Sequence, residues 1–200
     1  MWDQRYGEPG FAYGTRPNDF LAEQAHHIPP GGRVCELAAG EGRNAVHLAE
    51  LGYDVTAVDS SSVGLEKARI LARERGVSIR TVHADLADFD LGSEACDGIV
   101  SIFAHVPVAL REKLHAAVPR ALRPGGCLIL EAYTPQHPLM LSRGGPPAER
   151  IDLFMSLALL NKELGGLDFE IGQEVERPIE EGIYHQGHSA VVQVLGRKTR

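Results

Sequence analysis

The amino-acid sequence predicts an α/β fold: a doubly wound, mostly parallel sheet that ends in an antiparallel hairpin. From Arg33 to Ala132, apolar runs alternate with segments of helical spacing, as in a parallel sheet covered on both faces. A tight glycine turn follows the first run. The last two strand-like segments, residues 168–177 and 189–197, are joined by a connection too short for a crossover helix, so they are antiparallel.

The expected elements can be placed in order along the chain. Strands are predicted at residues 34–38, in the run that ends at Asp59, and at residues 78–84, 97–103, 127–132, 168–177 and 189–197. Helices are predicted at residues 20–27, from Arg43 or Ala45 onward, and at residues 63–75, 108–122 and 149–164. One of the serines at 60–62 can cap the helix that begins at Val63, and Gly76 can end it. The prediction is a Rossmann-like sheet of seven strands.

Composition excludes several classes of protein. The chain has 200 residues and a formal net charge of −7, which fits one domain and leaves no basic stripe for nucleic acid. No apolar run is long enough to span a membrane, and no targeting segment opens the chain. Its three cysteines lack metal-ligand spacing and lie in or beside apolar runs, as in a reducing cytoplasm. We expect a cytoplasmic domain without a metal, monomeric or homodimeric.

One stretch, residues 33–59, carries the strongest motif. It reads as strand, glycine turn, helix and strand, and it ends on Asp59, 19 positions after Gly40. That spacing is close to the roughly 20 residues between the turn and the ribose-binding acid of a nucleotide-binding βαβ unit. Glycine lets the backbone approach a ligand closely because it has no Cβ. An ordinary glycine turn without any ligand is the alternative at this stage.

The turn from Glu36 to Gly42, ELAAGEG, resembles the acid-x-G-x-G-x-G fingerprint of class I methyltransferases that use S-adenosylmethionine (SAM). Ala38 stands at the first glycine position, and Glu36 replaces the more usual Asp. A pyrophosphate would be repelled by Glu36 and Glu41, whereas SAM carries a sulfonium and an ammonium group and no phosphate. The turn therefore favours SAM over a dinucleotide.

Three segments extend the resemblance to nearly the whole chain: WDQRYGEPGFAYGTRPNDFL, GEGRNAVHLAELGYDVTAVD and EEGIYHQGHSAVVQVLGRK. Together they resemble bacterial methyltransferases of the tellurite-resistance type, relatives of the thiopurine methyltransferases. The resemblance implies one SAM-dependent domain over residues 1–200. Residues 1–30 would form an aromatic lid segment and helix, residues 31–135 the cofactor-binding half, and residues 136–200 the acceptor-side half. The aromatic residues of the lid segment could instead merely cover one edge of the sheet.

The resemblance also implies how SAM is bound. Glu36, Ala38, Gly40 and Gly42 would line its methionine moiety, and Asp59, with Ser60 beside it, would hold the ribose. Asp85 and the Leu86 amide would meet the adenine. Ser101, Ile102 and Phe103 would approach the methionine part through backbone carbonyls, and Arg16 would pair with its carboxylate. The full set of expected cofactor-binding residues is Tyr13, Arg16, Glu36, Ala38, Gly40, Gly42, Asp59, Ser60, Ala84, Asp85, Leu86, Ser101, Ile102 and Phe103.

Candidate catalytic residues follow from topology. The carboxyl ends of parallel strands share one edge of the sheet, and the connection at residues 178–188 should rise at that edge too. We therefore expect His105, His185 and Arg43 near the transferred methyl group, as a base or as contacts for an anionic acceptor. Further candidates are Tyr184, His188 and Arg143. Taken singly, each histidine is more simply explained as an ordinary hydrogen-bonded loop residue.

The predicted function is transfer of a methyl group from SAM to a small-molecule acceptor, such as a chalcogen oxyanion or another soft nucleophile. A non-catalytic SAM-binding domain is one alternative. An NAD-type oxidoreductase would need a third glycine and an uncharged turn, and the chain has neither. Methylation of a protein or nucleic acid is disfavoured by the acidic charge and by the absence of an added recognition domain.

Overall fold

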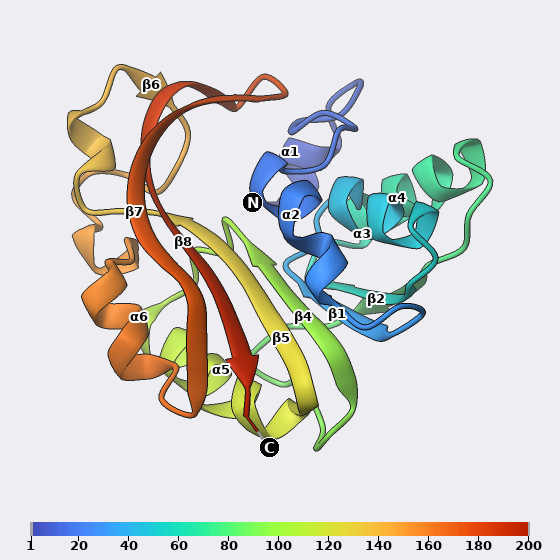
Figure 1. Ribbon diagram of the computed structural model, residues 1–200. Coiled ribbons are helices and arrows are strands. Elements are labelled where there is room, and N and C mark those ends of the chain that lie inside the picture. Colours follow the sequence, from blue (N-terminus) through green and yellow to red (C-terminus); the bar gives the residue numbers. More distant parts are fainter. Residues whose placement is uncertain (1, 200) are drawn as a thin grey trace.

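The sheet of the computed structural model, which describes residues 2–199, has the strand order β3-β2-β1-β4-β5-β8-β6, with β7 on the other side of β8 (Figure 1). The parallel strands are β1 (Arg33–Leu37), β2 (Asp54–Asp59), β3 (Arg80–His83), β4 (Cys96–Ile102) and β5 (Leu122–Tyr133). β8 (His185–Lys198) is antiparallel to both β5 and β7 (Leu167–Glu181). β7 therefore runs in the direction of the parallel strands, and its carboxyl end reaches the same edge.

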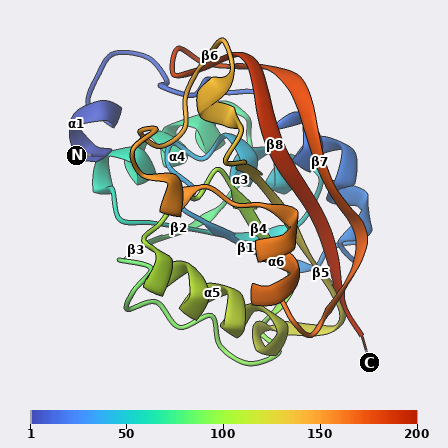
Figure 2. The same cartoon turned by 90° about the vertical axis from the view of Figure 1, so that its left-hand side faces the viewer.

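Helices cover both faces of this sheet (Figures 1 and 2). On one face lie α2 (Asp19–Gln24), α3 (Arg43–Glu50) and α4 (Ser62–Glu74), and on the other α5 (Val108–Ala121) and α6 (Leu157–Glu163). The short helix α1 (Trp2–Tyr6) packs against α4. Single 3-10 turns occur at η1 (Ala25–His27), η2 (His137–Leu139) and η3 (Ile151–Leu153).

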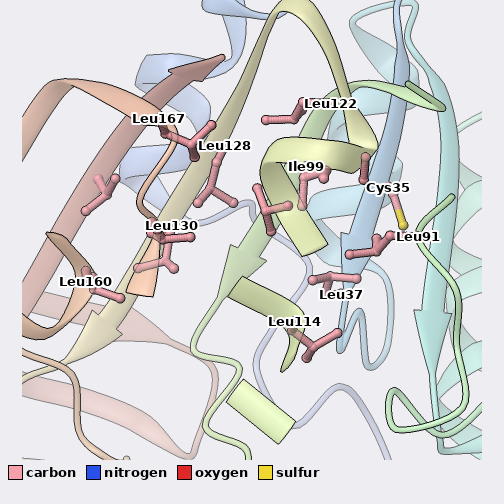
Figure 3. Packing of buried hydrophobic residues seen from close by; sticks show 14 of the residues in the cluster. Cys35, Leu37, Leu91, Ile99, Leu114, Leu122, Leu128, Leu130, Leu160 and Leu167 are labelled. Atoms are coloured by element: carbon pink, nitrogen blue, oxygen red, sulfur yellow. The ribbon is translucent and has the colours of Figure 1, made fainter. Parts of the chain in front are cut away.

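The hydrophobic core has one main cluster on each face of the sheet. Figure 3 shows the cluster under α5 and α6, where Leu128 and Leu130 of β5 meet Leu114 and Leu160. Burying such a side chain contributes about 1.5–3 kcal/mol. The opposite cluster contains Phe20 and Leu21 of α2, among others. These two layers hold the strand ends in fixed positions.

The turn between β1 and α3 is shaped by backbone conformation. Gly42 has a φ of 81°, and a Cβ there would lie 2.4 Å from the Cβ of Ala68, so only glycine lets α3 pack this closely on α4. Ala38 also has a positive φ, of 53°. An L-residue with a side chain rarely adopts this conformation, which costs about 1 kcal/mol. Ala38 thus occupies a glycine-like position.

Several predicted boundaries are wrong. The sheet has eight strands, because β6 (Ser142–Arg143) pairs with β8. This strand lies in a segment rich in proline and glycine, residues 134–147, which we call the Pro/Gly loop. The N-terminal segment, in which no helix is predicted before residue 20, contains α1. The predicted helix at 149–164 is only η3 followed by α6. The connection expected at 178–188 is mostly strand, because Pro178 pairs with His188 and Glu181 pairs with His185.

Within residues 2–199, no helix has both the length and the apolar character needed to cross a membrane.

Candidate functional site

A cavity of about 870 Å³ opens at the carboxyl ends of the parallel strands. It brings together most of the residues that the sequence predicts for the site. The predicted residues that line it are Tyr13, Glu36, Ala38, Gly40, Arg43, Asp59, Ser60, Asp85, Leu86, Ile102, Phe103, His105 and His185. Asp59 and Asp85, which follow different strands, thus face one cavity, as ligand binding at this edge of an open α/β sheet requires.

Four predicted cofactor residues do not line this cavity. Gly42 packs against Ala68 of α4, and Ala84 uses its backbone N–H to donate to the Asp59 carbonyl. Ser101 is buried inside β4. Arg16 is exposed, and only its carbonyl is engaged, by Arg43 at 3.4 Å. The structure therefore does not support an ion pair from Arg16 to a bound cofactor.

Glu36, at the end of β1, is a buried acid with an unused oxygen. One carboxylate oxygen accepts from Asn44 Nδ2 at 3.0 Å, whereas Oε2 has no hydrogen-bond partner among residues 2–199. Burial raises the pKa of Glu36 to about 7, against the opposing effect of the Asn44 hydrogen bond. An unpartnered buried oxygen is costly, so this site is suited to a cationic or hydrogen-bond-donating ligand group.

Asp59 holds the glycine turn in place. Its Oδ2 accepts from the Gly40 N–H at 2.7 Å, and its Oδ1 accepts from the Ser61 N–H at 2.8 Å. Burial raises the pKa of Asp59, and these backbone hydrogen bonds oppose the rise. A carboxylate has about four acceptor sites, so Asp59 keeps capacity for two ligand hydroxyls.

Glu41 does not have the role that the sequence predicts for it. Its carboxylate accepts from the Ala12 N–H at 2.7 Å and from Lys67 Nζ at 2.9 Å, and its side chain is almost fully buried. Its charge is therefore neutralised by Lys67, and it anchors the N-terminal segment to the glycine turn. Among the turn acids, Glu36 remains the one with an unsatisfied oxygen.

The expected adenine end of the cavity contains Asp85 and Leu86. Asp85 is exposed, and its Oδ1 accepts from the Ala87 N–H at 2.8 Å. The neighbouring Leu86 side chain is buried in the core cluster under α5. One carboxylate oxygen of Asp85 is thus left for a ligand at the cavity wall.

Two segments far apart in the sequence form the roof of the cavity: residues 2–14 and the hairpin turn at residues 182–184. The Ile183 N–H donates to the Ala12 carbonyl at 3.0 Å, and the Tyr184 hydroxyl donates to Glu8 at 2.9 Å. The Arg5 guanidinium lies 4.6 Å from the ring centre of Tyr184. The N-terminal aromatic segment therefore lies at the cavity, and its action as a lid stays a prediction. Sequence reasoning did not identify Arg5 or the hairpin turn as parts of this contact.

The structure does not support His105 as a base. Its Nδ1 donates to the Leu153 carbonyl at 2.8 Å, and its Nε2 accepts from the Tyr133 N–H at 3.2 Å. Burial lowers the pKa of His105 to about 4. Both ring nitrogens are used by the backbone, so the ring is held neutral and joins strand β5 to the segment around Leu153.

His185 has one ring nitrogen engaged and the other free. Nδ1 lies 3.4 Å from Glu181 Oε2, and Nε2 has no hydrogen-bond partner among residues 2–199. The ring contacts Tyr13 and Phe103, with centroids 4.4 and 4.8 Å away. Burial lowers the pKa of His185, and the neighbouring Glu181 opposes this effect. A neutral ring at this place can accept a proton.

The cation Arg43 is not free for an acceptor. Its Nη2 donates to Glu181 Oε2 at 2.6 Å, and both side chains are buried. The expected role of Arg43 as an anion contact therefore loses support. His188 is exposed and faces Glu176 instead of the cavity. Arg143 lies at the cavity and makes no ion pair within residues 2–199.

Aromatic rings form the wall beyond His185, and sequence reasoning did not predict this. Tyr133 stacks on Phe103 and on His137, at centroid distances of 4.5 and 3.9 Å. The Tyr133 hydroxyl is buried and has no partner among the described residues. Gly144 closes over it, because a Cβ there would lie 2.7 Å from the hydroxyl. This wall of the cavity is therefore aromatic and polarisable, and it holds one buried hydroxyl without a partner among the described residues.

The fold and this cavity define a class of nucleoside-binding α/β proteins, with an acid at the end of β1 and another at the end of β2. A family model for a methyltransferase domain matches residues 34–126. The chain is 30% identical over 200 residues to the uncharacterized methyltransferase sll0829 of Synechocystis, with coverage of 88% of this chain and 85% of that protein. The chain belongs to the class I SAM-dependent methyltransferase family.

Solved structures share the fold. TehB from Haemophilus influenzae superposes with a TM-score of 0.74 at 19% identity, over 99% of this chain and 66% of that one. Magnesium protoporphyrin IX methyltransferase from Synechocystis, solved with bound SAM, gives a TM-score of 0.63 at 18% identity, over 90% and 75%. The chain spans 55% of another relative, the uncharacterized methyltransferase YodH of Bacillus subtilis, at 29% identity. SAM is the cofactor of this family, which leaves the dinucleotide alternative without support.

Proposed function

We propose that this chain transfers the methyl group of SAM to a small-molecule acceptor with a soft nucleophilic atom. The observation that carries the proposal is the unpartnered Oε2 of Glu36, which lies in the same cavity as Asp59. Glu36 would bind the ammonium group of SAM, Asp59 the ribose hydroxyls and Asp85 the adenine amine. When bound, SAM supplies a methyl group on a positively charged sulfur.

The acceptor would enter between the aromatic wall and the Pro/Gly loop. Phe103 and Tyr133 offer polarisable surfaces, and Arg143 offers a cation that has no ion-pair partner within residues 2–199. We propose a chalcogen oxyanion such as tellurite or selenite, or a thiol, as the acceptor class. The resemblance to the tellurite-resistance type and the fold shared with TehB point in the same direction. Because the leaving group is already activated, the chain mainly positions the acceptor and, for a protonated acceptor, removes its proton through His185.

Calorimetry and a turnover assay test this proposal. SAM and its demethylated product should each bind to the folded protein. Formation of the demethylated product should then be followed with tellurite, selenite, thiols and small amines. Absence of binding by either nucleoside would overturn the proposal. Binding without turnover of any acceptor would favour the non-catalytic alternative.

We expect binding of SAM to weaken at acidic pH because of Glu36. Its pKa is raised to about 7 in the free protein, and the cationic ammonium group favours the ionised form. Between pH 8 and pH 6 the affinity should therefore fall about tenfold, with proton release on binding near pH 6. Calorimetry in buffers of different ionisation enthalpy measures both effects.

Titration of Glu36 should change the stability of the free protein in the direction opposite to its effect on SAM binding. Between its unfolded pKa and about 7, the folded state holds a proton that the unfolded state lacks, so stability of the free protein falls as pH rises through this range. Glu36→Gln keeps an oxygen for Asn44 and removes the titration. This variant should bind SAM about 10–100-fold more weakly, independently of pH between 6 and 8. A pH-independent affinity in the unsubstituted protein would contradict the assignment of Glu36.

A further inference from the structure

Glu181 is a buried acid that does not line the cavity and has no role in the chemistry described so far. It ends β7, directly opposite His185 at the start of β8. Its Oε1 accepts from Asn18 Nδ2 at 2.9 Å, and its Oε2 accepts from Arg43 at 2.6 Å and faces His185 Nδ1 at 3.4 Å. Arg177 of β7 also lies 3.7 Å from Oε1. The carboxylate is thus held by the N-terminal segment, by α3, by β7 and by β8.

We infer that Glu181 is the positioning residue that makes His185 a proton acceptor, by holding the ring proton on Nδ1 and leaving Nε2 bare toward the cavity. The inference rests on the proposed function, because it assigns His185 the task of deprotonating the acceptor. A carboxylate can only accept, so the nitrogen that faces it must carry the proton. The other nitrogen then has its lone pair available. The same logic orients the histidine of acid–histidine–nucleophile enzymes.

Charge in this cluster supports the assignment. Burial would raise the pKa of Glu181, but the His185 hydrogen bond and the Arg43 charge outweigh it and hold the pKa at about 2. The carboxylate therefore stays ionised at neutral pH. The rings of Tyr13, Phe103 and Tyr133 surround His185, and the positive charges of Arg43 and Arg5 lie nearby. His105 and His137 are the other titratable groups close to this ring. These rings and cations favour a neutral imidazole, the form that accepts a proton.

Methyl transfer and proton transfer are coupled in this arrangement. The acceptor's nucleophilic atom forms a bond to the methyl carbon, the carbon–sulfur bond breaks with its electron pair remaining on sulfur, and the acceptor's proton passes to His185 Nε2. The imidazolium that forms is stabilised by the Glu181 carboxylate. Arg43 then has a role different from the one predicted. It balances the negative charge of Glu181 before the proton reaches His185.

Nitrogen NMR of the histidine rings tests the inference without knowledge of the acceptor. In the unsubstituted protein, His185 should carry its proton on Nδ1. In Glu181→Gln, the amide can donate to Nδ1, so the proton should move to Nε2. The matched control is Glu180→Gln, the exposed neighbouring acid on β7, which should leave the ring unchanged. A His185 proton on Nε2 in the unsubstituted protein would overturn the inference, even if Glu181→Gln did not fold.

A turnover measurement adds the catalytic readout, with a simple thiol as the acceptor. Below the pKa of the thiol, Glu181→Gln should lower the rate about 100-fold or more, the usual contribution of a general base. Above that pKa the loss should shrink, because the thiolate needs no base. Glu181→Gln should add no further loss to a His185→Gln protein. An equal loss at both pH values would assign Glu181 a merely structural role and contradict the inference. If the unsubstituted protein did not bind SAM at all, the proposed function itself would be wrong.

Discussion

Replacing Asp59 with alanine should lower the affinity for SAM at least a hundredfold. Each hydrogen bond from a ribose hydroxyl to this carboxylate is worth about 1.5–3 kcal/mol, and two of them are expected. The substitution also frees the Gly40 and Ser61 N–H groups that the carboxylate holds at 2.7 and 2.8 Å. The glycine turn would thus lose its shape as well as its contact with the ligand. Isothermal titration calorimetry with SAM measures the change.

A second substitution separates these two effects. Asp59→Asn keeps one oxygen for the backbone and loses the charge, so its affinity should lie between those of the unsubstituted protein and Asp59→Ala. Asp168→Asn, at an exposed position far along the chain on β7, serves as a control and should bind SAM normally. Tight binding by a folded Asp59→Ala protein would show that the ribose is held elsewhere.

Replacing Arg177 with methionine should lower the free energy of unfolding by about 3–5 kcal/mol, the usual effect of leaving a buried charge without its partner. Arg177 makes two hydrogen bonds, of 2.8 and 2.7 Å, to the two carboxylate oxygens of Glu131. Glu131 is fully buried near the carboxyl end of β5. Asn18 and Gln193 also donate to it, but neither neutralises its charge. Urea unfolding measures the difference.

The double variant Glu131→Gln with Arg177→Met should recover most of the lost stability, because it removes the unpaired charge. Arg177→Lys should be intermediate, since lysine cannot make the two parallel hydrogen bonds. The control is Arg73→Met on the exposed face of α4, where the ion pair with Glu66 is 3.8 Å long and solvated. That change should stay within about 0.5 kcal/mol. A loss of under 1 kcal/mol in Arg177→Met would show that Glu131 is not charged in the folded state.

The parallel half of the fold could be predicted because its signals are local. The run from β1 through the glycine turn to Asp59 is contiguous in sequence, and the positions of Asp59 and Asp85 after their strands place both at one edge. Ala38 was recognised only as a departure from a glycine pattern. Its positive φ explains that pattern: the turn needs the conformation, and a small residue can tolerate it.

The acceptor side could not be predicted because it depends on pairing between distant segments. Pro178 made the end of β7 resemble a loop, yet β7 lies at the edge of the sheet, where proline is tolerated. With that pairing unknown, Glu181 had no reason to be placed beside His185. The two ring nitrogens of His105 are used by the backbone of Leu153 and of Tyr133. These residues lie 48 and 28 positions away in the sequence. A histidine's chemical availability depends on such partners, and composition does not reveal them.

Arg43 and Asn44, neighbours in the first turn of α3, hold Glu181 on one side and Glu36 on the other. Substitutions in this helical turn would therefore disturb both the proposed SAM contact at Glu36 and the proposed proton transfer at His185. We expect this turn to tolerate few substitutions. The Pro/Gly loop and the hairpin turn at residues 182–184 do not contact both of these acids. Divergence toward new acceptors, in nature or by directed evolution, should accordingly concentrate in residues 139–147 of this loop and in residues 182–184, which are the segments to randomise in a library.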